Sequence, residues 1–149
     1  MIRRGTGARS FQWPRVLAEG VAMNGLARVC WITAPLYAVL GMVFGIYMSA
    51  SGDHTFSPAH GHLNLLGWVT IALYGAFYTL VPEAAASRLA KLQVLLAQIG
   101  VIVIVPGIVF AISGTGEGLA KAGSVLILLA ALLFLVIVVR GTGRSAAGA

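Results

Sequence analysis

Four long apolar runs without a charged residue constrain this chain more than any other feature. A helix that crosses the hydrocarbon core of a bilayer needs about 20 mostly apolar residues. Four windows approach that length, at 31–50, 63–81, 92–112 and 122–139. Charged residues make up only 9% of the 149 residues, against roughly 25% in soluble domains. The sequence therefore predicts an all-α membrane protein, a bundle of four transmembrane helices.

The remaining segments are too short to hold a second domain, so residues 1–149 form a single membrane domain. The basic N-terminal segment 1–30 mixes apolar and charged residues, a composition that favours a helix lying at the membrane interface. The segment 140–149 is small and polar and is expected to be a flexible tail. Within the third window, Gln98 is expected to form a hydrogen bond to another helix.

The distribution of basic residues predicts the orientation of the bundle. Nine of the ten Lys and Arg residues fall on one side of the predicted membrane, and Lys121 alone falls on the other. Basic residues are retained in the cytoplasm, so both termini are expected to be cytoplasmic in a multi-pass protein of the bacterial inner membrane. Topology and attraction to anionic lipid account for the net charge of +6. Nucleic acid is therefore not an expected partner.

Several kinds of chemistry are disfavoured by what the chain lacks. Cys30 is the single cysteine, so neither a disulfide within the chain nor covalent attachment of a c-type haem is expected. The four acidic residues, Glu19, Asp53, Glu83 and Glu117, all lie outside the apolar windows. Proton relays across a bilayer commonly use buried carboxylates, so a proton pump built from this chain alone is not expected.

Three histidines, His54, His60 and His62, lie close together on the predicted outer side. Imidazole is a versatile ligand for iron, copper and zinc, although a polar ring is also tolerated at the lipid headgroups. Residues two apart project about 200° apart on a regular helix, so His60 and His62 belong to different faces. His60 shares its face with polar, aromatic and glycine residues, which also suit close helix packing.

The face of His62 is apolar and continues through Leu65, Leu66, Val69 and Leu73. An imidazole above aliphatic side chains suits a porphyrin and its iron. Contact with lipid would explain the same aliphatic face. The residues alone therefore leave both interpretations open.

The stretch HLNLLGWVTIALYGAFYTLVPE, residues 62–83, resembles the second transmembrane helix of the haem-copper oxidase large subunit, most closely in the nitric oxide reductase branch. The resemblance covers roughly 36–83. It implies that His62, which heads the motif, is an axial ligand of a low-spin haem b near the outer face, with Leu65, Leu66 and Val69 against the porphyrin. His60 would then lie beside the cofactor or serve as an alternative ligand.

The chain departs from that family in length and in ligands. It lacks the later helices that supply the second haem ligand and the other metal ligands, and its third and fourth windows contain no histidine. A complete oxidase or reductase is therefore not expected. The second axial ligand stays open between His62 of a second copy in a homodimer, which we favour, and His60, His54, Met42 or Met48 of the same chain. A five-coordinate iron is the remaining alternative.

The sequence thus predicts a haem b protein for electron transfer or for redox or gas sensing. Two alternatives remain at this point. One is a haem-free accessory or assembly subunit of a respiratory complex. The other is a copper or zinc site in the outer loop, formed by Asp53, His54, His60 and His62.

Overall fold

The computed structural model describes residues 24–146, with side chains through residue 140, and within this range all the regular secondary structure is helical. Four apolar helical segments are long enough to cross a bilayer, which confirms a multi-pass membrane protein. The first is α1 (Gly25–Ser51), and the second is composed of α2 (Ser57–His62), the π-helical segment η2 (Leu63–Thr70) and α3 (Ile71–Leu80). The short α4 (Pro82–Ala85) leads to α5 (Arg88–Ile112), and α6 (Gly118–Ala146) completes the bundle.

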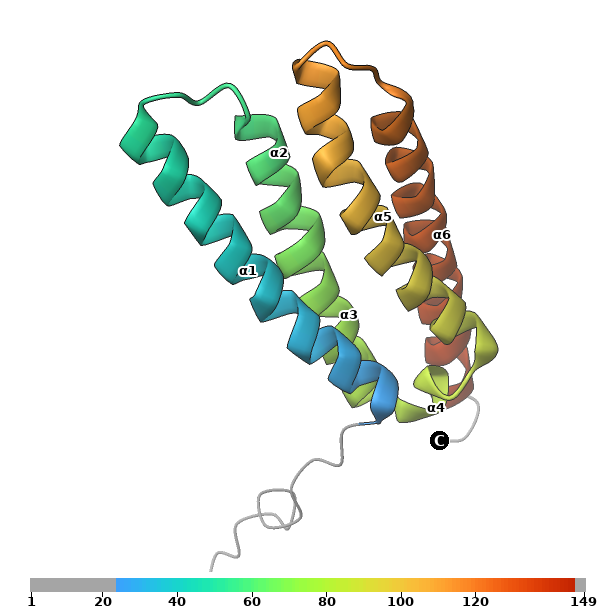
Figure 1. Cartoon of the computed structure of the whole chain (residues 1–149). Coiled ribbons are helices and arrows are strands. Elements are labelled where there is room, and N and C mark those ends of the chain that lie inside the picture. Colours follow the sequence, from blue (N-terminus) through green and yellow to red (C-terminus); the bar gives the residue numbers. More distant parts are fainter. Residues whose placement is uncertain (1–23, 147–149) are drawn as a thin grey trace, which may run out of the picture.

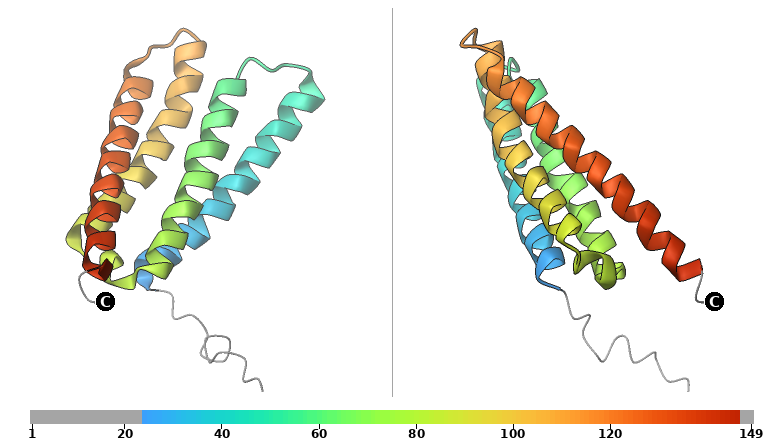
Figure 2. Two further views of the ribbon diagram at one scale, coloured as in Figure 1. Left: turned by 180° about the vertical axis from the view of Figure 1, so that it is seen from behind. Right: turned by 90° about the vertical axis from the view of Figure 1, so that its right-hand side faces the viewer.

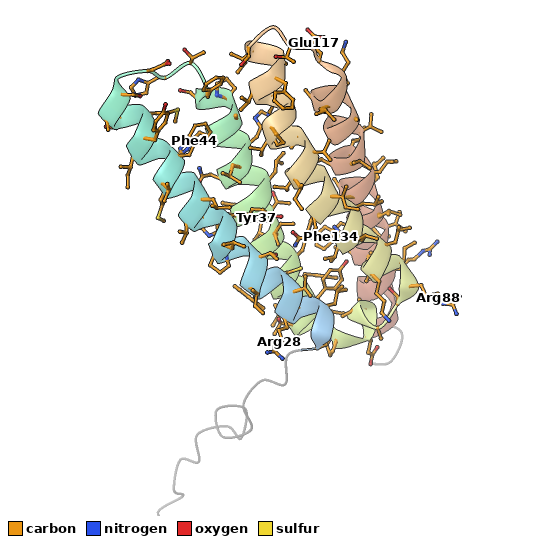
Figure 3. All side chains as sticks on the ribbon, viewed as in Figure 1. Arg28, Tyr37, Phe44, Arg88, Glu117 and Phe134 are labelled. Carbon is orange, nitrogen blue, oxygen red and sulfur yellow. The ribbon has the colours of Figure 1, made fainter. Side chains whose placement is uncertain are left out.

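The helices run alternately up and down and pair as two hairpins (Figure 1). The first hairpin joins α1 to the second span, and the second joins α5 to α6. In the side view, α6 is inclined to the other long helices, so its C-terminal end lies apart from them (Figure 2). Arg28 and Arg88 lie at one end of the bundle and Glu117 lies at the other (Figure 3). We call these the basic end and the histidine end, because the latter also carries the loop with His54.

The ends of the first and last spans differ from the prediction. The helix α1 begins at Gly25 rather than at position 31, because Asn24 caps it by accepting a hydrogen bond from the Ala27 N–H at 2.8 Å. Residues 1–23, where most of the predicted interfacial helix falls, lie outside the described range. The helix α6 continues to Ala146, so it includes most of the segment 140–149 that was predicted as a tail. No proline stops it, and extending a formed helix costs little.

The second span contains a π-helix that the sequence did not predict. Thr70 Oγ1 donates to the Leu65 carbonyl, five residues back, at 2.8 Å. Five of the buried residues of this span recur every four positions: Ala59, Leu63, Gly67, Ile71 and Gly75. Four residues of a regular α-helix overshoot a full turn by about 40°. The wider π-helical turn reduces this rotation and so keeps these residues on the inner face of the bundle.

Aromatic rings and glutamines connect the two hairpins. Phe134 of α6 packs between rings of α3, with centroid distances of 4.5 Å to Tyr74 and 5.1 Å to Phe77. On α5, Gln98 accepts a hydrogen bond from the Tyr37 hydroxyl at 2.8 Å and donates to Thr33 Oγ1 at 2.7 Å. The expectation that Gln98 bonds to another helix is confirmed. These contacts fix the second hairpin against the first.

Candidate functional site

A locally bonded loop sets the start of the second span. The Asp53 carboxylate accepts hydrogen bonds from the Thr55 N–H at 2.9 Å and the Thr55 hydroxyl at 2.6 Å. These bonds lower the pKa of Asp53 below its usual value. Pro58 then occupies the first turn of α2, where a missing N–H costs nothing. The loop therefore delivers His60 and His62 on a short regular helix.

His60 faces α1, where a glycine makes room for it. A Cβ atom at Gly45 would lie 3.0 Å from His60 Cε1. The Phe44 ring stands edge-on to the imidazole, with the two ring centroids 6.0 Å apart. The Asn64 amide donates to the His60 carbonyl at 2.9 Å. One turn along α1, Gly41 makes room for the side chain of Asn64. His60 is half-buried and belongs to the packing of the first hairpin.

His62 lies exposed on α2, away from this packing. Its Nδ1 is 2.7 Å from the Pro58 carbonyl oxygen. A carbonyl can only accept a hydrogen bond, so Nδ1 must carry the proton. In the neutral ring, Nε2 then holds the free lone pair. Metal-ligating histidines are commonly held in this way, with one nitrogen bonded to a backbone carbonyl and the other directed to the metal.

The apolar face predicted beside His62 is only partly formed as expected. Leu65 and Val69 are 61% and 40% exposed, and Leu73 one turn further on is 61% exposed. Leu66 instead packs half-buried against the core, because the buried stripe includes the neighbouring Gly67. An exposed imidazole and an exposed aliphatic strip therefore share one surface of the second span. We call this surface, formed by His62, Leu65, Val69 and Leu73, the His62 face.

These residues fit one side of a haem. The His62 face offers a nitrogen lone pair for the iron and aliphatic side chains for the porphyrin. Within the chain, the other ligand candidates lie in different settings. His60 packs on α1, Met48 is buried, Met42 is exposed on α1, and His54 is exposed in the loop. The second ligand thus remains a prediction, and the exposure of the His62 face leaves it accessible to a second copy.

The alternative copper or zinc site gains no geometric support. Among residues 24–146, no group of three or more His, Cys, Asp or Glu side chains lies close enough to hold a metal ion. The Asp53 carboxylate is engaged by Thr55, and His60 faces α1. The four residues proposed for that site are therefore not assembled within the described chain.

One buried polar residue escaped the sequence analysis. Gln93 of α5 is 0% exposed and accepts a hydrogen bond from the Tyr78 hydroxyl at 2.9 Å. Its Nε2 has no hydrogen-bond partner within the part of the chain that the structure describes. An amide inside an apolar window is the signal that predicts such a bond between helices. This sequence signal applies to Gln93 as well as to Gln98.

Comparison with protein-family models, with curated proteins and with solved structures finds no match to this chain. The fold alone defines the class, an all-α membrane protein with four candidate spans. The haem hypothesis rests on the motif headed by His62 and on the surroundings of that residue.

Proposed function

We propose that this protein binds haem b at its histidine end, with His62 as an axial ligand, and serves in electron transfer or in redox or gas sensing. The observation that carries the proposal is the hydrogen bond from His62 Nδ1 to the Pro58 carbonyl at 2.7 Å. This bond fixes the tautomer whose Nε2 can bind iron.

Each residue of the His62 face has a defined task in this proposal. His62 would hold the iron, while Leu65, Val69 and Leu73 would contact the macrocycle and exclude water from it. When bound, the haem supplies one-electron redox chemistry. The Pro58 carbonyl keeps the imidazole ring in one orientation.

A homodimer would complete the site. The His62 face is exposed along its length, and a two-fold axis would bring a second copy of the same face against it. Two His62 side chains would then supply both axial ligands of one haem. The expected stoichiometry is one haem for every two chains.

The proposed orientation places the histidine end outside the cytoplasm. It is supported by Arg28 and Arg88 at the opposite end (Figure 3). Lys91 in the first turn of α5 and Arg140 toward the end of α6 lie at that end too, and basic residues are retained in the cytoplasm. A reporter that is active only in the cytoplasm, fused after Ala149, should be active. Activity of a periplasmic reporter fused there would overturn the orientation and the outer position of the haem with it.

The absorption spectrum of the purified protein tests the haem proposal. The wild type should show a Soret band and split visible bands on reduction. His62→Ala should lose the haem or become high-spin, because the coordinate bond is removed. His60→Ala is the matched control and should retain a low-spin spectrum, since His60 packs on α1.

Two outcomes would contradict haem binding by His62, and a third would contradict the shared ligand. Loss of haem in His60→Ala but not in His62→Ala would assign the ligand to the other histidine. A protein that purifies without a Soret band and takes up no added haemin would favour the haem-free accessory role. One haem per chain in a strict monomer would exclude the shared ligand and leave the single-chain ligands.

A further inference from the structure

A cavity of about 190 Å³ lies at the basic end, away from the histidines. The turn between α3 and α5, the start of α5 and the C-terminal part of α6 line it. This is the region where α6 lies apart from the other long helices (Figure 2). Its lining combines the charged residues Glu83 and Arg140 with the apolar residues Val81, Leu89 and Ile137.

The two charges at this cavity are held apart. Glu83 and Arg140 are both exposed, and they form no ion pair within 4.0 Å. Among the described residues, one ion pair forms, between Lys121 and Glu117 at the histidine end. Ser87, also in the lining, is already bonded, since it donates to the Ala84 carbonyl at 2.8 Å and accepts from the Ala90 N–H. The carboxylate and the guanidinium are therefore the groups free to meet a ligand.

The position of the cavity favours a lipid. The helix α3 ends at Leu80 and α5 begins at Arg88. The cavity therefore lies where the spans leave the hydrocarbon core. Apolar walls formed by Val81, Leu89 and Ile137 suit the upper part of an acyl chain. A free anion in water would gain nothing from them.

We propose that this cavity binds the headgroup of a phospholipid that carries a phosphate and a primary ammonium, the chemistry of phosphatidylethanolamine. Arg140 meets the phosphate through its guanidinium, which matches phosphate oxygens in geometry and charge. Glu83 accepts hydrogen bonds from the ammonium. The inference is independent of haem binding, because the two sites lie at opposite ends of the bundle.

Two other headgroups fit less well. A choline headgroup has no N–H to donate to Glu83, and quaternary ammonium groups are typically held by aromatic rings. Among the residues that the structure describes, no aromatic side chain lines this cavity. A headgroup with only negative charge, such as phosphatidylglycerol, would be repelled by the Glu83 carboxylate.

The test measures retained lipid by native mass spectrometry of the full chain. The protein is exposed to equal amounts of phosphatidylethanolamine, phosphatidylcholine and phosphatidylglycerol with identical acyl chains. The wild type should retain the first about tenfold over the others, the scale of one charge-assisted hydrogen bond. Arg140→Gln should lose retention of all three lipids, and Glu83→Gln should lose only the preference.

Arg88→Gln is the matched control, because Arg88 is an exposed arginine at the same end that does not line the cavity. It should behave as the wild type. Equal retention of the three lipids by the wild type, or an unchanged preference in Glu83→Gln, would overturn the proposal. Displacement of the lipid by free phosphoethanolamine would overturn the role of the apolar walls and assign the site to a soluble ligand.

Discussion

The two hairpins pack by different means. In the first, glycines of one helix face side chains of the other, as Gly41 faces Asn64 and Gly67 faces Tyr37. In the second, Gly107 and Gly123 face backbone, while Gly100 faces the Ile127 side chain. A Cβ at Gly107 would lie 2.5 Å from the Ala120 nitrogen, and one at Gly123 would lie 2.6 Å from the Ile104 Cα. Side chains can rotate to accommodate a change, whereas two packed backbones must separate.

This difference matches the distribution of chemically active residues. The first hairpin carries the three histidines and the π-helical segment, and π-helical turns occur often at functional sites. The described part of the second hairpin carries no histidine and brings α5 and α6 together through small residues. One hairpin thus offers candidate ligands, while the other provides a closely packed support.

The largest effect on stability is expected from glycine substitutions that distinguish the hairpins. Gly107→Ala should lower the free energy of unfolding by about 3 kcal/mol, the upper part of the range for overpacking, because backbone must move. Gly41→Ala should cost about 1 kcal/mol, since the Asn64 side chain can rotate away. Unfolding in mixed micelles with increasing sodium dodecyl sulfate, followed by circular dichroism, measures both.

Gly61→Ala provides the control, because nothing lies within 4 Å of a Cβ built at Gly61. It should leave the unfolding transition unchanged. Equal decreases in the free energy of unfolding for Gly107→Ala and Gly41→Ala would mean that the two hairpins accommodate an added methyl group equally well.

The sequence predicted the four spans well but not their details. The windows follow from apolar length, which does not depend on neighbours. The start of α1 was missed because Arg28 interrupts the apolar run, although a long arginine can extend its charged group to the interface. The π-helical segment depends on how the inner face meets its neighbours, which periodicity alone cannot show. For the same reason Leu66 was assigned to the face of His62 but packs half-buried against the core.

For the candidate site, helical geometry correctly separated His60 from His62, since both lie on the regular helix α2. It could not reveal the bond to the Pro58 carbonyl, which depends on a side-chain rotamer. Nor could spacing show that the Asp53 carboxylate accepts hydrogen bonds from Thr55. The copper or zinc site in the outer loop therefore remained an alternative to haem. Local bonds of this kind depend on the folded conformation of the loop and not on residue spacing.

An intermediate effect is expected where the hairpins are joined by hydrogen bonds. Tyr37→Phe and Gln98→Leu each remove the bond between the Tyr37 hydroxyl and Gln98 Oε1. A double-mutant cycle should give a coupling of about 0.6 kcal/mol, the average found for hydrogen bonds between membrane helices, and no more than about 1.7 kcal/mol. The same unfolding assay measures all four proteins. A coupling of zero would show that the aromatic contacts of Phe134 join the hairpins without this bond.

The smallest effect on stability is expected at the residue proposed to matter most for function. His62 is exposed, and its side chain is hydrogen-bonded to the carbonyl of Pro58 in its own short helix. In the haem-free protein, His62→Ala should therefore change the free energy of unfolding by no more than about 0.5 kcal/mol, as surface substitutions usually do. His60→Ala should cost more, because it removes packing against Phe44 and Gly45. If His62→Ala were the more damaging of the two without haem, His62 would be a structural residue, and loss of haem in that variant would no longer identify a ligand.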